Sequence, residues 1–396
     1  MMKSRFVFVL LSVILFGCQS GNQKSEPGSL RVIDISKNYS KKVIHLQNAA
    51  DIEYIPLETT DDVLLGQMCI LSYVSDKYMV IWEIGRCDIF VFDRNGKIIT
   101  HFNHKGNGDK EYLGITNVIF DEKNNEIFVL SMPTHSILVY SISGEYKRIL
   151  RYITDLNIAS AYNFDDETLL VYNDYRPYYE STCERPYMFM SKKDGSIVSA
   201  LDIRMPIRYS NRIVQEIDLG GDQKGFTPLV LSTPNNRYFG QDFVIADISS
   251  DTIYILKPNK ELSPLLVRTP SVHISEPRSV WTSLLTTDEF IVLHMVTLDF
   301  TAAEKGRPIP SVTLMYDFKT EEICEVSFVD IDYNMRKWQS LGVFSPDISK
   351  NMYAELISVP KLKDAYEKNL LKGKLGELIE RLDENDNPIV RIVNFK

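Results

Sequence analysis

The chain has few residues of the kinds that bind metals or form disulfides. Its 396 residues include five cysteines and six histidines, and neither a Cys-x-x-Cys pair nor a His-Glu-x-x-His motif occurs. Zinc sites need such ligands at short, regular spacings, so these absences argue against one. The Gly-x-Ser-x-Gly elbow of hydrolases and the phosphate-binding P-loop are absent as well. The sequence therefore predicts no metal, no cofactor and no catalytic residue.

Long apolar runs are also scarce. The one that occurs, residues 6–16, is too short to span a bilayer, follows a basic stretch and ends in Gly17-Cys18. This arrangement predicts a lipoprotein export signal over residues 1–17 with lipidation of Cys18; the alternative is an ordinary secretory signal with a chance cysteine. The polar residues 18–29 predict a flexible tether.

Lipidation would hold the protein on a membrane without crossing it. Gln19 is not the aspartate associated with inner-membrane retention, which favours the outer membrane of the cell envelope, facing the periplasm or the cell surface. Lysine and arginine total 44 against 53 aspartate and glutamate residues, a net charge of −9. An acidic chain of this kind is a poor partner for nucleic acid.

Four cysteines remain beyond the signal: Cys69, Cys87, Cys183 and Cys324. In an oxidising compartment a Cys69–Cys87 disulfide is the first pairing to expect. Burial of the thiols as small hydrophobic side chains is the alternative.

Short runs of β-branched and aromatic residues separated by turn residues dominate the body, with little helical periodicity before residue 360. One unit recurs. Its first half is a strand, an Asp/Asn/Lys turn and a strongly apolar strand, over residues 70–82, 118–130, 161–172, 229–246, 284–294 and 343–358. Its second half is another hairpin, over residues 89–99, 137–146, 188–198, 253–266 and 313–326. Two hairpins make a four-stranded antiparallel sheet, the size of one propeller blade.

The count gives six first halves and five second halves. The sixth blade is completed if the C-terminal strand Ile389–Phe395 joins an N-terminal strand from Arg31–Leu57, which removes exposed sheet edges. The sequence therefore predicts an all-β, six-bladed β-propeller over residues 30–396, closed by both termini. Apolar residues at three- and four-residue steps predict a helical insertion at about 361–384, split by Gly373 and Gly376 and packed on the sixth blade as a buttress.

Three segments resemble the six-bladed propeller lipoproteins of Bacteroidota, which are distantly similar to NHL-repeat propellers. They are Ile52–Thr59, Phe92–Lys97 with the glycine loop Gly106–Tyr112, and Leu378–Val390. The group usually reads Gly-x-Gly-Pro-Gly-Glu-Tyr at the glycine loop, whereas Asp109-Lys110 stands here in place of Pro-Gly. The resemblance implies the fold and the compartment, and it brings no catalytic residues.

Aromatic and arginine side chains in three insertions are the candidate ligand-binding residues, because aromatic faces stack on sugars and apolar groups while arginine grips carboxylates. They are Tyr175, Arg176, Tyr178, Tyr179, Arg278, Trp281, Arg336 and Trp338. The alternative is that the aromatic side chains fold their own loops onto the propeller. His101, His104, Asp109 and Glu111 could form a metal site, but their spacing supports one only weakly. The glycine loop is followed by a predicted strand and not by the helix N-terminus that a phosphate-binding loop needs, so we interpret it as a connection between blades.

Three functions remain open. The first is a non-enzymatic lipoprotein whose propeller face binds a glycan, a peptide or an envelope protein. The second is a hydrolase or lyase that acts on polysaccharide or peptide in the central funnel. The third is a structural subunit of an envelope complex. An enzyme is expected to gather several ionisable groups with shifted pKa values in the funnel, whereas a binding module is expected to show aromatic residues with few acids.

Overall fold

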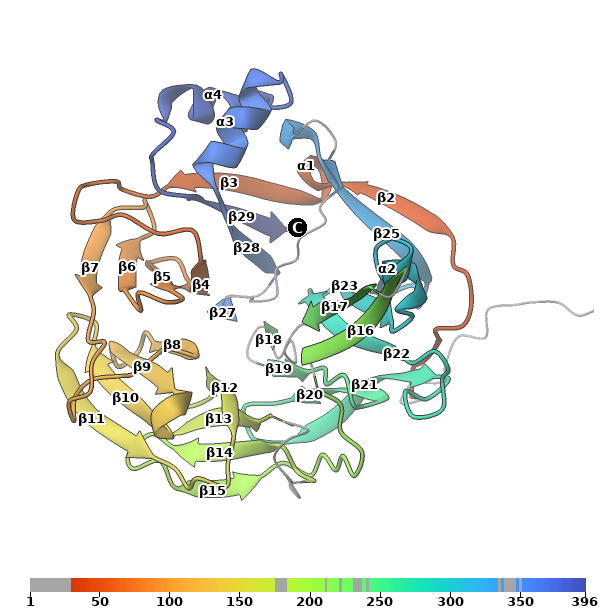
Figure 1. Cartoon of the computed structure of the whole chain (residues 1–396), viewed down its shortest axis with the longest axis horizontal. Helices are drawn as coiled ribbons and strands as arrows, with labels where there is room; N and C mark the ends of the chain where they lie inside the picture. Colours follow the sequence, from red (N-terminus) through yellow and green to blue (C-terminus); the bar gives the residue numbers. More distant parts are fainter. Residues whose placement is uncertain are drawn as a thin grey trace, which may run out of the picture.

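The computed structural model describes residues 30–174, 184–210, 212–220, 223–230, 237–239, 242–333, 336–337, 347–348 and 351–396. Six blades stand in a ring around a central axis (Figure 1). The predicted six-bladed propeller is therefore confirmed. None of the helices in these ranges is long and apolar enough to cross a membrane.

The first three blades each contain four antiparallel strands that follow the predicted units, and a short strand from elsewhere joins blade 1. Blade 1 contains β4 (Cys69–Val74), β5 (Tyr78–Glu83), β6 (Ile89–Asp93) and β7 (Ile98–Phe102). Blade 2 contains β8 (Asn117–Asp121), β9 (Glu126–Ser131), β10 (Ser136–Ser141) and β11 (Tyr146–Arg151). Blade 3 contains β12 (Ile158–Asn163), β13 (Thr168–Asn173), β14 (Tyr187–Ser191) and β15 (Ile197–Ala200).

Blades 4 and 5 repeat the same order. Blade 4 contains β18 (Arg237–Phe239), β19 (Asp242–Ile245), β20 (Thr252–Leu256) and β21 (Leu262–Thr269). Blade 5 contains β22 (Ser279–Thr286), β23 (Phe290–Thr297), β24 (Ser311–Asp317) and β25 (Ile323–Asp330), with β26 (Arg336–Lys337) paired to β25. The predicted unit at residues 229–246 began too early. Its start belongs to β17 (Gln223–Val230), which pairs with β16 (Arg212–Gly220) as a separate hairpin.

Both chain termini build blade 6, as predicted. Its strands are β28 (Met352–Ile357), β29 (Ile389–Phe395) and β3 (Ala50–Pro56), in that order. Part of the predicted hairpin over 343–358 lies outside the described residues. The short strand β27 (Asp347–Ile348) pairs in parallel with β4 of blade 1, and the described part of blade 6 has three strands.

The N-terminal segment serves three blades rather than one. Before β3 it forms β1 (Val32–Asp34), parallel to β21 of blade 4, and β2 (Lys41–His45), parallel to β25 of blade 5. The short helix α1 (Leu46–Ala49) then leads into β3. We call residues 31–57 the N-terminal strap. It covers outer strand edges that would otherwise present unpaired backbone groups.

The hydrophobic cores lie between successive blades, because inner strands are buried on both faces. β13 is buried along its whole length, whereas all four residues of the outer strand β15 are exposed. Cys69 and Cys87 are free thiols, with Cys87 inside the core between blades 1 and 2, so the predicted disulfide is wrong. Burial of a small apolar thiol accounts for the position of Cys87.

Outer hairpins pack closely on the preceding blade. Gly96, in the turn between β6 and β7, has a φ of +84°, and a Cβ there would lie 2.1 Å from the Pro56 carbonyl oxygen of blade 6. Only glycine meets both demands, the left-handed backbone and the close approach.

Helices α3 (Val359–Glu367) and α4 (Gly373–Arg381) form the buttress seen beside blade 6 in Figure 1. Their buried residues pack with Ile389 of β29 in one cluster, which confirms the predicted role. Gly373 marks the break between the helices, with a φ of +53°. Gly376 lies inside α4, so the prediction that it also breaks the helix was wrong.

Candidate functional site

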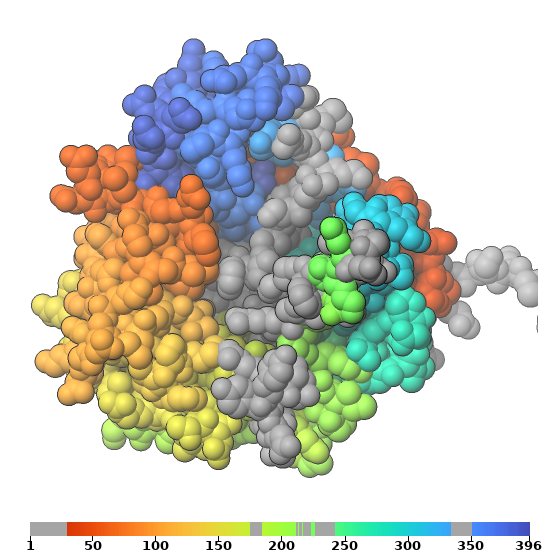
Figure 2. Space-filling model, viewed as in Figure 1, coloured from red at the N-terminus to blue at the C-terminus, as the bar shows by residue number. Residues whose placement is uncertain are grey.

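The longest connections of the propeller emerge on one face. Strands alternate in direction, so connections after the second and fourth strands of a blade share one face, and tight turns occupy the other. The long connections include residues 103–116, 174–186, 201–236, 270–278, 298–310 and 358–388. We call this side the insertion face and the opposite side the turn face. Figure 2 shows the described part of the β16–β17 hairpin standing on the insertion face.

Most of the predicted site residues fall outside the described residues: Cys18, Tyr175, Arg176, Tyr178, Tyr179 and Trp338. Arg336 lies in β26, and the structure describes its backbone only. Arg278 and Trp281 remain for comparison with the structure.

Trp281 is a core residue and not part of an exposed ligand surface. Its side chain is 1% exposed and packs between blades 4 and 5, with its indole N–H donating to the Ser250 carbonyl at 3.2 Å. The prediction placed it in the insertion; it lies instead in β22, the strand that follows, where an inward-facing side chain meets the neighbouring blade.

Arg278 lies on the insertion face in a cluster with Tyr209 and His273. Its guanidinium carbon sits 4.0 Å from the centre of the Tyr209 ring. The Tyr209 hydroxyl is 2.9 Å from Nδ1 of His273. Arg278 and Tyr209 are partly buried, whereas His273 is exposed. The cluster thus combines a stacked cation, a phenol and an imidazole at the surface.

The loop that carries Arg278 is fixed at both ends. Arg268, a buried residue of β21, donates from Nε to the Pro270 carbonyl at 3.0 Å and from Nη1 to the Ser279 carbonyl at 2.5 Å. The backbone N–H of Val272 donates to the Asp251 carboxylate at 2.6 Å. Burial lowers the pKa of Arg268 to about 10, which leaves it charged at neutral pH. This internal arginine holds the loop against the blade.

Sequence reasoning found Arg278 but missed its two neighbours. Tyr209 and His273 are 64 residues apart and belong to different connections. The backbone N–H of Tyr209 donates to the Ser249 hydroxyl at 2.9 Å, which anchors the first connection on blade 4. No local sequence motif marks either residue, because the two connections meet only when the blades close into the propeller.

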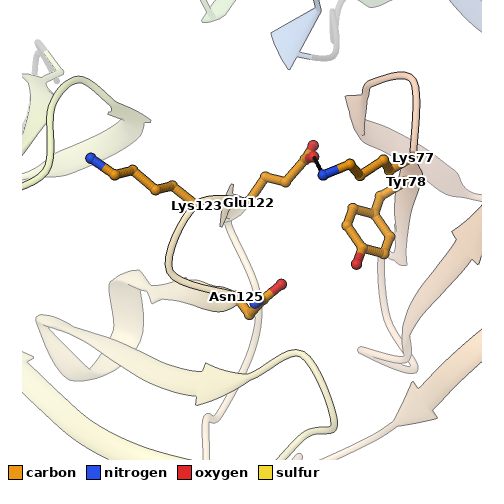
Figure 3. A pocket seen from close by; sticks show the side chains of 5 residues that line it. All are labelled: Lys77, Tyr78, Glu122, Lys123 and Asn125. Atoms are coloured by element: carbon orange, nitrogen blue, oxygen red, sulfur yellow. Dashed lines mark ion pairs between the residues drawn. The ribbon is translucent and has the colours of Figure 1, made fainter.

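A polar hollow of about 510 Å³ lies on the turn face between blades 1 and 2 (Figure 3). Lys77, Tyr78, Glu122, Lys123 and Asn125 line it. The Lys77 ammonium lies 3.7 Å from the Glu122 carboxylate, and Lys123 points the other way. The lysine side chain is 74% exposed, so this ion pair contributes little. The hollow is a groove between two hairpin turns.

The glycine loop joins blades 1 and 2. The Tyr112 side chain at its end is fully buried, and its hydroxyl donates to the Cys87 carbonyl at 3.0 Å. His104 lies 2.8 Å from the Gly144 carbonyl, while His101 lies 2.9 Å from the Asp88 carboxylate. The two histidines therefore serve different contacts. Among the residues that the structure describes, no three His, Cys, Asp or Glu side chains are placed to hold a metal.

A buried ionic network closes the ring between blades 5 and 6. Glu355, Arg391 and Tyr54 are cross-strand neighbours in β28, β29 and β3. Arg391 forms ion pairs with Glu355 and with Asp330 at the end of β25. The Tyr54 hydroxyl lies 3.3 Å from the Asp332 carboxylate. We call this set the closure network.

The closure network shifts the pKa values of its acids. Burial raises the pKa of Glu355, against the opposing effect of Arg391. Burial also raises the pKa of Asp332, and the neighbouring charge of Asp330 adds to that shift. Helices α3 and α4 cover this region, since Tyr54 and Tyr333 pack in the cluster of the buttress. The shifted acids therefore lie in a seam between blades.

The sequence matches one protein family over residues 30–394, described as a domain of unknown function, DUF4934. The chain belongs to the DUF4934 family. Its match covers the strap, all six blades and the buttress, so in this DUF4934 protein the family unit is the whole closed ring. No protein with a curated description matches the sequence.

Solved structures share the fold of this DUF4934 chain. A Bacteroides fragilis protein assigned as exported is 14% identical, with a TM-score of 0.63 over 92% of this chain and 99% of that chain. A DUF4221 family member from Bacteroides vulgatus is 11% identical, with a TM-score of 0.44 over 88% and 97%. Virginiamycin B lyase from Staphylococcus aureus is 10% identical, with a TM-score of 0.38 over 87% and 99%. The first of these likenesses supports the propeller fold.

Proposed function

We propose that this DUF4934 protein is a lipid-anchored, extracytoplasmic binding module that takes its ligand on the insertion face. The observation that carries the proposal is the Arg278 cluster, a surface cation held rigidly on a tyrosine ring where the long connections gather. Binding sites in rigid scaffolds are built on such connections because loop sequence can vary without loss of the core.

The placement of the acids favours binding over catalysis. Asp332 and Glu355, the described carboxyl groups whose pKa values are raised, lie in the closure network and pair with Tyr54 and Arg391. A glycosidase or lyase needs such acids free to face a substrate. In the closure network they are used to join two blades.

The anchor rests on the export signal and on Cys18. The strap begins at Val32 on the outer edge of blade 4, and the twelve-residue tether over 18–29 reaches at most about 40 Å when fully extended. That reach keeps the propeller beside its membrane.

Two measurements test the proposal. Metabolic labelling with a fatty-acid analogue is expected to label the wild type and not a Cys18→Ser variant, and label in both would refute lipidation at this residue. A glycan and peptide array is then probed with the soluble chain from Ser29. Binding is expected for the wild type and weakened by Arg278→Gln. Equal binding by both would remove the Arg278 cluster from the proposal, and turnover of an arrayed compound would favour the enzyme.

A further inference from the structure

Within the described part of the chain, no acceptor is found for the charge of Arg278. Nε is buried without a hydrogen-bond partner, and the described residues give the guanidinium no ion pair. Arg391 and Arg268 also carry one unpartnered nitrogen each, but their guanidinium groups have other acceptors, two carboxylates for Arg391 and two carbonyls for Arg268. A buried donor without an acceptor costs stability, so an arginine kept in this state needs an explanation.

The two terminal NH₂ groups of Arg278 are the ones that a ligand reaches, because Nε is shielded and they are not. Two N–H groups in one plane match the two oxygens of a carboxylate. The geometry is set in advance: the guanidinium stacks on Tyr209, and the Arg278 carbonyl accepts the backbone N–H of Leu298 at 2.7 Å. Little side-chain freedom remains to be lost on binding.

The Tyr209–His273 pair supplies a further donor. If the Tyr209 hydroxyl donates to Nδ1, the neutral imidazole carries its proton on Nε2; in the other tautomer the hydroxyl hydrogen is free. In either case one donor of the pair is left for a ligand. The His273 imidazole and the Arg278 guanidinium both contact the Tyr209 ring.

Two exposed apolar residues lie next to the cluster residues in the sequence. Ile274, next to His273, is 77% exposed, and Ile207, two residues before Tyr209, is 51% exposed. Exposed isoleucines at these sequence positions, together with an arginine that no described residue pairs, match a ligand that carries an apolar group next to its carboxylate. A peptide C-terminus with an apolar last residue has this chemistry, whereas an acidic sugar presents hydroxyl groups instead.

We propose that the Arg278 cluster binds the C-terminal carboxylate of a peptide whose last residue is apolar. This inference rests on the proposed binding function and names its ligand. Arg278 binds the two carboxylate oxygens, the Tyr209–His273 pair donates to the same group, and Ile207 and Ile274 contact the last side chain.

Isothermal titration calorimetry of the chain from Ser29 tests the inference with three probes: acetyl-alanyl-leucine, its C-terminal amide and glucuronate. The free acid is expected to bind at least tenfold more tightly than the amide and than glucuronate. Arg278→Gln is expected to lose at least tenfold in affinity for the free acid. Arg307→Gln, which changes an exposed arginine on the neighbouring connection, is expected to bind as the wild type does.

Equal binding of acid and amide, or unchanged binding by a folded Arg278→Gln variant, would overturn the inference. Preference for glucuronate would overturn the assignment to peptides, and so would the absence of binding by all three probes. The glycan and peptide array distinguishes failure of this inference from failure of the proposed function. A ligand of another class that binds on the array and depends on Arg278 would still support the proposed binding function.

Discussion

Replacement of Arg391 by methionine is expected to weaken the ring at the point where it closes. Arg391 is 5% exposed and Asp330 is 2% exposed, and the arginine is the cation that both Asp330 and Glu355 contact. Removal of one member of a buried ion pair typically costs about 3–5 kcal/mol, because the remaining charge stays buried without compensation. Two carboxylates are left here, so we expect a loss at the upper end of that range, about 4–5 kcal/mol.

The loss is measured as the change in free energy of unfolding in urea, followed by tryptophan fluorescence and by far-ultraviolet circular dichroism. Lys396→Met is the matched control, since Lys396 directly follows β29, the strand that contains Arg391, and pairs with Asp51, but both side chains are exposed, at 58% and 78%. An exposed pair of this kind contributes at most about 1 kcal/mol. A loss below about 1 kcal/mol for Arg391→Met would refute the assignment of a stabilising role to the closure network.

The same variant predicts a pH dependence. Burial already raises the pKa of Glu355 in the folded protein, and removal of Arg391 takes away the charge that lowers it. A carboxyl group with a raised folded pKa binds a proton that the unfolded chain does not, so stability rises as pH falls through that folded pKa. The deficit of Arg391→Met relative to the wild type is therefore expected to be largest at pH 7–8 and to shrink toward pH 5. A constant deficit over this range would contradict the mechanism.

Three further predictions follow from the fold. Gly96→Ala is expected to lower the free energy of unfolding in urea by about 2 kcal/mol or more, because the alanine would combine a left-handed φ with a contact against blade 6. The control is Gly306→Ala, where φ is +64° but the surrounding space is open, and it should cost only about 1 kcal/mol. Equal losses in the two variants would contradict the packing argument. Deletion of residues 30–45 uncovers the outer edges of β21 and β25, so the shortened protein is expected to aggregate. Size-exclusion chromatography and light scattering will measure this, and a monomeric product would show that the strap is dispensable. Cys69 and Cys87 are expected to be alkylated after denaturation without any reductant, as peptide mass mapping will show, and a disulfide-linked peptide would refute the free thiols.

The repeated hairpins made most of the fold predictable. Strand periodicity, turn residues and blade counting are local properties, and they placed blades 1, 2, 3 and 5 within about five residues of their true bounds. The join of β3 with β29 was also predictable, because an incomplete blade demands a partner strand. The hairpin β16–β17 was not, since a polar insertion between blades has the same alternation as a blade strand.

The candidate site was predictable only in part. Arg278 stood out as an arginine within an insertion, and the same reasoning selected Trp281, which the fold buries. A sequence shows that a residue is aromatic, but the side of the strand it occupies depends on register. Cys69 and Cys87 show the same limit, because proximity in sequence gives no information on the geometry that a disulfide requires.

By itself the sequence determined the class of fold, the number of blades and the use of both termini in closure, because these follow from periodicity and from the need to pair every edge. The tertiary structure decided which side chains meet. It brought Tyr209 from one connection to His273 and Arg278 on another, aligned Glu355, Arg391 and Tyr54 across three strands, and laid the strap over two more blades. These contacts join residues far apart in the chain, and such contacts depend on the closed ring and not on any local pattern.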